Sequence, residues 1–419
     1  MKKTLLLAAL FIAFTCITAR AQVIAVKAGK LVDPETGTTS TNQIILIEGS
    51  KIKAIGTAIQ IPAGATVIDL SDSTVLPGLF DSHTHMCMTM LKERDANNYY
   101  FTTLLDSTGY RAIQGVANAR AMLESGFTTI RDVGNSANYA DSDLRRAIEE
   151  GLVPGPTIIN AGRIIAPYGG QFQLQPEKRG LATPEYLFAD TKDELKKAIR
   201  ENIHYGAKVI KLVVDDQQYI YSVDDIKFAI EEAAKAGLKV AAHCWTDAGA
   251  RNAAEAGVAS IEHGFRMSDE ALRVAKKNNV VLVGTDFTEF AAREMGRPQL
   301  HPIFVDRLRR AYKIGVTMAF GTDVIFTSAG QTRGTLSVEF ITSFVEAGVP
   351  AKEILKIMTI NAARLLGVDK ERGAIKAGLA ADIIATPENP LDNISTLKKV
   401  SFVMKDGKVF KKSASRAEH

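Results

Sequence analysis

The middle of the chain alternates short apolar runs with amphipathic stretches of helical period. Several of the helical stretches end at a glycine, as expected after the last turn of a helix. The expected helices include Asp193–Tyr205, Asp224–Ala236, Ala248–Ala256 and Asp269–Asn278. Eight such units predict an α/β protein with a (β/α)8 barrel (TIM barrel) over residues 76–368. An open doubly wound sheet would give the same alternation, but no glycine-rich phosphate-binding turn follows the first strand. The expected strands are Thr74–Leu76 running toward Asp81, Thr128–Asp132, Thr157–Ala161, Lys208–Val213, Lys239–His243, Ala259–His263, Val280–Gly284 and Thr317–Thr322.

The two ends of the chain show a different pattern, of short strands joined by tight turns. Residues 22–75 contain a hairpin signal at Gly49-Ser50, and residues 369–419 contain one at Asp406-Gly407. Neither segment has enough strands for a stable sheet of its own. We therefore expect the two segments to form one small β-sandwich together.

The first residues have the layout of a secretory signal peptide. Lys2 and Lys3 precede an uncharged run over residues 5–18, and Ala19-Arg20-Ala21 is a small-x-small cleavage pattern. The alternative is an N-terminal membrane anchor, but a span takes ~20 apolar residues. We expect cleavage near Ala21, an exported protein (periplasmic or secreted) and no stable membrane association.

Charge and cysteine content exclude some partners. Removal of residues 1–21 removes three basic residues and no acidic one, so the formal net charge falls from +4 to +1. No Lys/Arg run remains that would indicate a nucleic-acid partner. Cys87 and Cys244 are too few for a disulfide framework. Composition leaves open whether the protein is a monomer or a homo-oligomer.

Candidate metal ligands fall at the ends of the predicted barrel strands. They are His83, His85, His243, His263 and Asp323. The carboxyl ends of barrel strands share one face, which is where barrel enzymes place their sites. Imidazole and carboxylate ligands suit Zn²⁺, with iron, manganese or cobalt as alternatives. A lone histidine is more often a hydrogen-bonded core residue, but this number at separate strand ends favours a metal site.

Lys211 lies inside an apolar run that we assign to the fourth strand. Burying an unpaired ammonium group is costly, and burial makes a neutral, nucleophilic amine more accessible. Such an amine can react with CO2 to give a carbamate, an anionic ligand whose two oxygens can bridge two metal ions. The alternative is a lysine that reaches the barrel mouth or pairs with Asp215 or Asp216. The residues alone leave both interpretations open.

Four motifs accompany these residues: Leu76-Pro77-Gly78-Leu79-Phe80-Asp81 ahead of His83-Thr84-His85, Thr128-Thr129-Ile130-Arg131-Asp132, Ser260-Ile261-Glu262-His263-Gly264 and Gly373-Ala374-Ile375-Lys376-Ala377-Gly378-Leu379-Ala380-Ala381-Asp382. With them the sequence resembles the amidohydrolase superfamily, in particular the imidazolonepropionase-related branch that includes Xaa-Pro-type dipeptidases and carboxypeptidases. The resemblance covers essentially the whole mature chain. The ligand pattern is specific to the superfamily, whereas the substrate is not fixed by it.

The resemblance implies a pair of divalent metal ions and a role for each ligand. His83, His85 and Asp323 would hold the more buried ion, and His243 and His263 the more exposed one. Carboxylated Lys211 would bridge them. The ions would activate a water molecule, and Asp323 would take its proton and deliver it to the leaving amine.

The resemblance also suggests substrate contacts. Arg251 stands where similar peptidases have an arginine for the substrate carboxylate, although Trp245 replaces the tyrosine expected six positions before it. Tyr168 and Gln171 fall in a segment that contributes to the site in relatives. The alternatives are that Trp245 only packs against its neighbours and that Arg251 is a solvent-exposed residue on the helix after the fifth strand.

The predicted function is hydrolysis of an amide bond in a peptide or N-acyl amino acid with a free carboxylate. An alternative with the same metal chemistry is the opening of a cyclic amide or imidazolone-type ring. A third hypothesis, from a different class, is a non-catalytic periplasmic protein that binds a metal or ligand.

Overall fold

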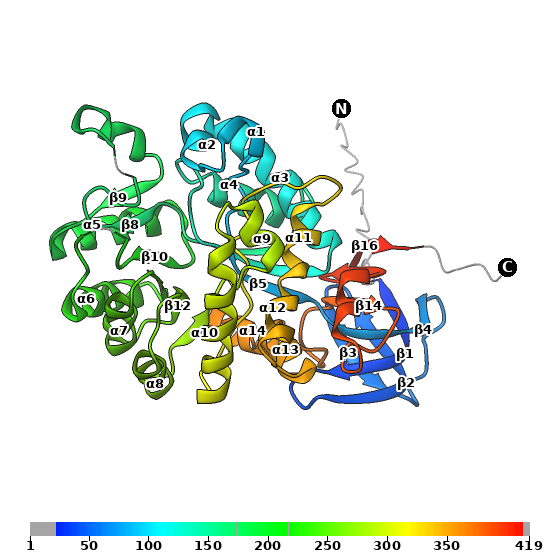
Figure 1. Cartoon of the computed structure of the whole chain (residues 1–419). Helices are drawn as coiled ribbons and strands as arrows, with labels where there is room; N and C mark the ends of the chain where they lie inside the picture. Colours follow the sequence, from blue (N-terminus) through cyan, green and yellow to red (C-terminus); the bar gives the residue numbers. More distant parts are fainter. Residues whose placement is uncertain (1–21, 173, 217, 414–419) are drawn as a thin grey trace, which may run out of the picture.

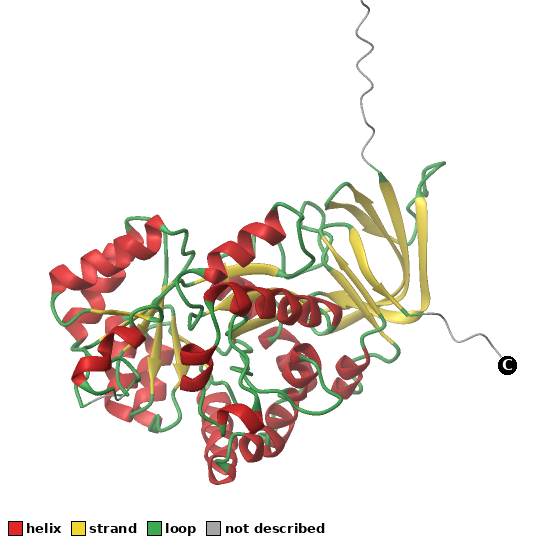
Figure 2. Cartoon of the chain, turned by 90° about the horizontal axis from the view of Figure 1, so that it is seen from above, coloured by secondary structure: helices red, strands yellow, loops and turns green. Residues whose placement is uncertain are grey.

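The computed structural model describes residues 22–172, 174–216 and 218–413, so the predicted signal peptide lies outside the described residues. The described chain has an all-strand part at one end and a part that mixes strands and helices at the other (Figure 2). Figure 1 shows that the first strands (blue) and the last strands (red) lie side by side. The mixed part carries the candidate site.

The first and last strands form one seven-stranded sheet in the order β16-β15-β14-β4-β1-β2-β3. Its members are β1 (Val23–Asp33), β2 (Thr38–Glu48), β3 (Lys51–Gly56), β4 (Thr66–Pro77), β14 (Ile383–Thr386), β15 (Phe402–Lys405) and β16 (Lys408–Lys412). The junction is the antiparallel pairing of β4 with β14, in which Leu76 faces Ile384. The sheet therefore needs both ends of the chain, as expected. The hydrogen bonds define one sheet, so the predicted two-sheet sandwich is not confirmed.

Both predicted hairpins of this sheet are present. Glu48 pairs with Lys51 around Gly49-Ser50, and Lys405 pairs with Lys408 around Asp406-Gly407. Asp406 and Gly407 both have positive φ angles (48° and 76°). This is the backbone of the two-residue turn that matches the twist of antiparallel strands, which explains the Asp-Gly pair.

The mixed part is built on two parallel sheets. One has the order β5-β6-β7 and the other the order β13-β12-β11-β10-β8-β9. Their strands are β5 (Leu79–Thr84), β6 (Phe127–Asp132), β7 (Thr157–Asn160), β8 (Ile164–Ala166), β9 (Tyr186–Phe188), β10 (Ile210–Val213), β11 (Val240–Cys244), β12 (Ser260–His263) and β13 (Val281–Val283).

The predicted single closed barrel is not observed, and two local features of the backbone account for this. The third predicted strand is present as β7, but a turn at Gly162 (φ 72°) leads from it into β8, a strand that was not predicted and that belongs to the other sheet. The eighth predicted strand, Thr317–Thr322, is not a regular strand. It nevertheless connects the two sheets, because Thr317 O accepts from Leu282 N of β13 and Phe320 O accepts from Ser82 N of β5.

The predicted strand from Thr74 toward Asp81 is divided as well. It ends as β4 at Pro77 and resumes as β5 at Leu79. At the break, a Cβ on Gly78 would lie 2.1 Å from Thr128 Oγ1 of β6, so only glycine allows this close approach. The predicted boundary at residue 75 thus falls inside a continuous strand that joins the two parts.

Helices cover the parallel sheets on the outside (Figure 2). Thr191 and Ser222 cap α5 and α6 with reciprocal side-chain bonds to Glu194 and Asp225, as the sequence of these helix starts favours. Within the described residues no helix has the length and hydropathy to cross a membrane. The helices are α1 (Lys92–Asp95), α2 (Tyr100–Leu105), α3 (Thr108–Glu124), α4 (Ala140–Glu149), α5 (Lys192–His204), α6 (Val223–Ala234), α7 (Asp247–Ala256), α8 (Asp269–Lys277), α9 (Glu289–Glu294), α10 (His301–Ile314), α11 (Arg333–Glu339), α12 (Ile341–Glu346), α13 (Ala351–Ile357) and α14 (Ile360–Leu366), with 3-10 turns at Pro176–Ala182, Pro298–Leu300 and Ile394–Lys399.

Candidate metal centre

The side chains predicted as metal ligands line one cavity of about 430 Å³ at the carboxyl ends of the parallel strands. They come from β5 and the residues after it, β10, β11, β12 and the segment that connects the two sheets. The set is His83, His85, Lys211, His243, His263 and Asp323.

Three of these side chains are close enough to belong to one metal centre. Ligand atoms of His83, His263 and Asp323 all lie within 4.8 Å of one another. His85 Nε2 is 3.3 Å from Asp323 Oδ1, and the rings of His243 and His263 have centroids 4.6 Å apart. Imidazole nitrogens and a carboxylate in such a cluster match the ligands that zinc and similar ions prefer.

The second nitrogen of several imidazoles is held by a neighbouring group. His83 Nδ1 donates to Glu262 Oε2 at 2.7 Å, and His85 Nδ1 donates to the Gly134 carbonyl at 2.7 Å. These bonds turn the Nε2 atoms of both rings toward the cluster. An outer carboxylate or carbonyl partner of this kind is typical of metal-binding histidines.

Glu262 is itself fixed by Arg131 of β6. Arg131 Nη2 donates to Glu262 Oε1 at 2.7 Å, and its Nε donates to the Ser82 carbonyl at 2.6 Å. Both side chains are almost completely buried. The sequence motifs around residues 128–132 and 260–264 therefore meet beneath the cluster, where they orient His83.

Two buried nitrogens of the cluster have no hydrogen-bond partner among the described residues: His83 Nε2 and His243 Nε2. Buried polar atoms are rarely left unsatisfied, and each one costs about 1–3 kcal/mol. Burial also lowers the pKa of both imidazoles, which favours the neutral form that binds metals. The donor set of this chain therefore fits a divalent metal ion.

Lys211 is buried in β10, with 2% of its surface exposed. Its amine forms no hydrogen bond or ion pair within the part of the chain that the structure describes, so the alternative of pairing with Asp215 or Asp216 is not observed. Burial lowers its pKa to about 8, and Glu262 and Asp323 oppose that shift. A buried amine with this pKa is partly neutral near neutral pH, which is the form that reacts with CO2.

The connecting segment is fastened beside the cluster by Asp81. This fully buried carboxylate accepts from the backbone nitrogen (3.1 Å) and the hydroxyl (2.7 Å) of Thr322. Burial raises its pKa to about 7. Asp323 follows with a φ of 56°, and Asp323 N donates to the His83 carbonyl at 2.8 Å. These bonds place the Asp323 carboxylate over His83 and His85.

Apolar side chains form much of the remaining lining of the cavity, an apolar wall. It consists of Met88, Tyr99, Tyr100, Ile164, Trp245, Phe265, Phe287, Met295, Leu300, Phe304 and Ile325. Trp245 is half-buried and meets Phe265 edge to face, with ring centroids 4.6 Å apart. Trp245 was predicted either to contact the substrate or only to pack against its neighbours. It packs against Phe265 and also lines the cavity.

Polar groups also line the cavity wall. Gln171 Nε2 donates to Asp216 Oδ2 at 2.8 Å, so this predicted substrate contact does reach the cavity. Burial raises the pKa of Asp216, and the positive charge of Arg297 opposes that shift. Arg297 lies at the rim and forms no hydrogen bond or ion pair with the described residues through its guanidinium group.

Two predicted substrate contacts do not reach the cavity. Arg251 lies on α7, where it pairs with Glu270 (3.2 Å) and Asp247 (3.4 Å). Helix α8 presents Glu270 to it, and this contact between helices is not visible in the sequence. Tyr168 is half-exposed, at 53%, and packs against Phe188 outside the cavity lining. Neither residue belongs to the cavity lining, and their predicted substrate contacts are not observed.

The sequence reasoning missed several residues of the site. Glu262 and Arg131 appear in the sequence analysis only as members of motifs. The signal that could have identified them is a charged residue inside an apolar strand, the same signal that drew attention to Lys211. Asp216 follows a predicted strand end, which is the position that identified the histidines. Arg297 gives no such signal, because it lies in a loop after α9.

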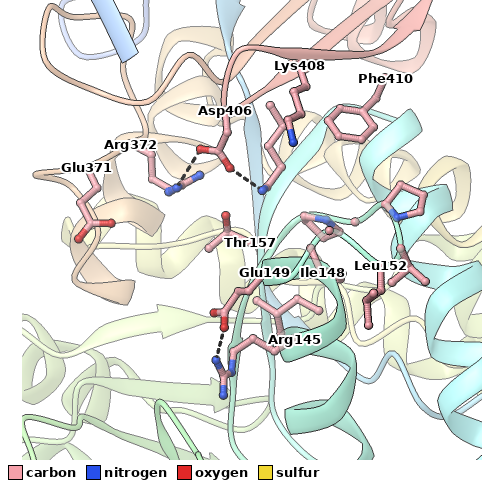
Figure 3. A pocket seen from close by; sticks show the side chains of 17 residues that line it. Arg145, Ile148, Glu149, Leu152, Thr157, Glu371, Arg372, Asp406, Lys408 and Phe410 are labelled. Atoms are coloured by element: carbon pink, nitrogen blue, oxygen red, sulfur yellow. Dashed lines mark hydrogen bonds and ion pairs between the residues drawn. The ribbon is translucent and has the colours of Figure 1, made fainter. Parts of the chain in front are cut away.

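A second cavity, of about 630 Å³, lies where α4 meets β15 and β16 (Figure 3). Its cationic groups are largely neutralised: Lys405 and Arg372 both reach Asp406, and Arg145 pairs with Glu149. It contains none of the predicted ligands. The chemistry of the protein is therefore to be sought in the smaller cavity.

Histidines, a carboxylate and a buried lysine at the carboxyl ends of parallel strands are suited to a metal-dependent hydrolase. The matches to known proteins make it a hydrolase acting on carbon–nitrogen bonds. Residues 74–410 match the model of the amidohydrolase family. The chain belongs to this family, as the sequence motifs predicted.

Relatives with assigned activities span nearly the whole chain. An ochratoxinase from Aspergillus niger is 28% identical across 94% of this chain and 88% of its own length. An imidazolonepropionase from Clostridium tetani is 23% identical across 89% of this chain and 91% of its own. Among solved structures, a Xaa-Pro dipeptidase with methionine bound in its active site superposes with a TM-score of 0.81 at 29% identity, over 93% of this chain and 100% of that one. The superfamily and branch predicted from the motifs are confirmed.

Proposed function

We propose that this amidohydrolase uses a binuclear metal centre to cleave the amide bond of a peptide or N-acyl amino acid with a free carboxylate. The observation that carries the proposal is the convergence of four imidazoles and Asp323 in one cavity, next to a buried Lys211 that has no partner among the described residues. An unpaired lysine is costly at this position unless it is converted to an anion that neighbouring cations stabilise.

In the proposed centre, His83, His85 and Asp323 would hold one ion, and His243 and His263 would hold the other. Lys211, as a CO2-derived carbamate, would supply an anionic ligand to both. Zn²⁺ suits these ligands best. The bound ions would lower the pKa of a water molecule and polarise the scissile carbonyl.

Asp323 is the proposed proton carrier. Its carboxylate is the most accessible of the acidic groups in the cluster, with 21% of the side chain exposed, whereas Glu262 is fully enclosed. Asp323 would accept the proton of the attacking water and return it to the leaving amine. Glu262 and Arg131 keep His83 in place during this transfer.

The apolar wall supports a substrate with a bulky or aromatic side chain. Its side chains exclude water around the amide and would bury an apolar group of the substrate. Arg297 takes over the role that the sequence suggested for Arg251, because a guanidinium group at the rim can grip a carboxylate through two hydrogen bonds. The similarity to a Xaa-Pro dipeptidase with methionine bound in its active site supports a peptide substrate.

The similarity to an imidazolonepropionase supports one alternative function, the opening of a cyclic amide or imidazolone-type ring. A cyclic amide would be opened by the same metal chemistry but would not need a carboxylate partner. The two functions differ in the substrate requirement and not in the metal centre.

The test is a hydrolysis screen with purified, zinc-loaded protein on dipeptides, N-acyl amino acids and cyclic amides, each acid beside its terminal amide. The proposal expects turnover of linear free acids and a clear loss when the carboxylate is amidated. Turnover restricted to cyclic amides would favour the alternative. No turnover of any amide would overturn the proposal, provided that the protein holds its metal.

Export is a further part of the proposal and rests on the residues before position 22. The expected mature protein starts at Gln22. N-terminal sequencing of protein from the native cell envelope tests this, and retention of Met1 would contradict it.

A further inference from the structure

Asp216 is a carboxylate on the cavity wall that the proposed metal centre does not use. It follows β10, the strand of Lys211. Its Oδ2 atom lies 3.5 Å from His243 Nε2, and a third of its side chain (33%) is exposed to the cavity. Asp216 thus places a negative charge immediately beside the cluster.

The position of this carboxylate is built into the fold. Gln171 donates to Asp216 from Nε2, and its own Oε1 accepts from the Tyr186 hydroxyl at 2.8 Å. The Tyr100 hydroxyl also donates to the Gln171 carbonyl. A chain of bonds that begins at two tyrosines therefore fixes Asp216.

Asp216 also has a φ of 132°, a region that residues other than glycine rarely adopt. Such strain persists where the surrounding structure enforces it, and it clusters at sites of function. Gln171 supplies one such enforcing contact.

A second charge of opposite sign lies at the rim of the same cavity. Arg297 carries a guanidinium group without an ion-pair partner in the described chain, and its charge reaches Asp216. An N-acyl amino acid offers a carboxylate for Arg297 and nothing for Asp216. A free dipeptide offers a carboxylate and an ammonium group.

The spacing within a dipeptide agrees with the arrangement of these charges. Its amino nitrogen is two bonds from the scissile carbonyl carbon, so it must lie next to the metal centre, as Asp216 does. Its carboxylate is on the far side of the peptide bond, and Arg297 is an exposed cation of the same cavity lining that can receive it.

We propose that the cavity selects dipeptides with a free α-amino group, with Asp216 binding the ammonium group and Arg297 the carboxylate. This inference rests on the proposed function and chooses between its two substrate classes. In the reaction, water adds across the peptide bond. The acyl carbon gains a hydroxyl, the C–N bond breaks, the nitrogen gains a proton, and two free amino acids leave.

The test compares phenylalanyl-leucine with its N-formyl derivative, which differs only at the α-amino nitrogen. Leucine release is followed for wild type, Asp216→Asn and the control Glu270→Gln, an exposed carboxylate outside the cavity. We expect wild type and control to prefer the free dipeptide by at least about tenfold in kcat/KM. Asp216→Asn should lose that preference through a fall on the free dipeptide alone. Equal rates on both substrates in wild type would overturn the inference.

Two further measurements keep the outcome unambiguous. Calorimetric binding of both peptides to zinc-loaded Asp323→Asn protein should show the same preference without turnover. If neither peptide is hydrolysed but the binding preference is present, the proposed function fails and this inference stands.

Elemental analysis of Asp216→Asn should show unchanged metal content, and loss of metal would make Asp216 a ligand and overturn the inference.

Discussion

At the scale of single residues, the candidate metal site is recognised by buried polar side chains that lack a hydrogen-bond or ion-pair partner. Most buried charges of this protein have a partner, as Arg131 has in Glu262. Lys211 has none within the described chain, and His83 and His243 each leave a buried nitrogen unsatisfied. All three groups line one cavity. The two imidazole nitrogens fit a divalent cation there, and Lys211 fits it once its amine is converted to an anionic carbamate.

Lys211→Ala should lose metal, because it removes the group that would neutralise both ions. We expect the variant to hold about one ion per chain or fewer. Loss of a residue that only supports a metal ligand lowers activity roughly 10–100-fold, and we expect a larger fall here because Lys211 would be a ligand itself. A short carboxylic acid should restore part of the activity by replacing the carbamate. Lys208→Ala, an exposed position beside the same strand, is the matched control. Unchanged metal content in Lys211→Ala, measured by elemental analysis, would refute the bridging role.

Asp323→Asn should keep at least part of its metal and lose turnover. The amide oxygen can still coordinate an ion, but the amide cannot take up a proton. General acid–base catalysis contributes roughly 10²–10⁴-fold, so kcat should fall by at least that order. Steady-state kinetics together with metal analysis measures both effects. Near-normal kcat in a metal-loaded variant would falsify the proton-transfer role.

Arg251 and Arg297 provide a matched pair of guanidinium groups. Arg297→Gln should cost about 2–4 kcal/mol in kcat/KM on a free acid and little on its amide, because a charge pair with the substrate is lost. Arg251→Gln should leave this preference intact and change stability by less than about 1 kcal/mol, because its partners are exposed. Kinetics on both substrates decides, and the reverse ranking would return the role to Arg251.

At the scale of elements, the strands serve as a frame that brings distant residues to one point. Arg131 of β6 and Glu262 of β12 join the two parallel sheets beneath the cluster. Arg131→Met would leave Glu262 buried without a counter-charge, at a cost of about 3–5 kcal/mol. Denaturant unfolding should show this loss, together with weaker metal binding because His83 loses its support. Arg200→Met, whose partner Glu232 lies on the outer helices, should cost much less. Equal losses in the two variants would contradict the special role of the buried pair.

The elements also show what the sequence could predict. The histidines were found because a strand end is a local pattern, and the side chains predicted there do meet in one cavity. Helices α5 to α8 were predicted within one or two residues at most termini, because their periodicity and caps are local too. The interruption at Gly162 and the irregular segment before Asp323 depend on close contacts between distant residues, which no local pattern contains. The Arg251–Glu270 pair was missed for the same reason.

At the scale of the whole molecule, the two chain ends form one sheet attached to the catalytic part through β4 and β5. Ile45 and Ile68 from the first end share an apolar cluster with Phe402 and Met404 from the second. A chain that stops after residue 380 would lose β14–β16 and expose the edge of β4. We expect it to lose cooperative thermal unfolding and to aggregate, whereas a chain that stops after residue 413 should behave as wild type. A cooperative transition at the wild-type temperature in the shorter chain would show that the sheet is dispensable.

The central claim is that the cluster is a two-metal centre that hydrolyses amides. Its most direct test is to remove the metal with a chelator and titrate Zn²⁺ back while following hydrolysis of a dipeptide. The account predicts no activity without metal and a rise that ends at about two equivalents per chain. Full activity in metal-free protein, or saturation at a single equivalent, would contradict it.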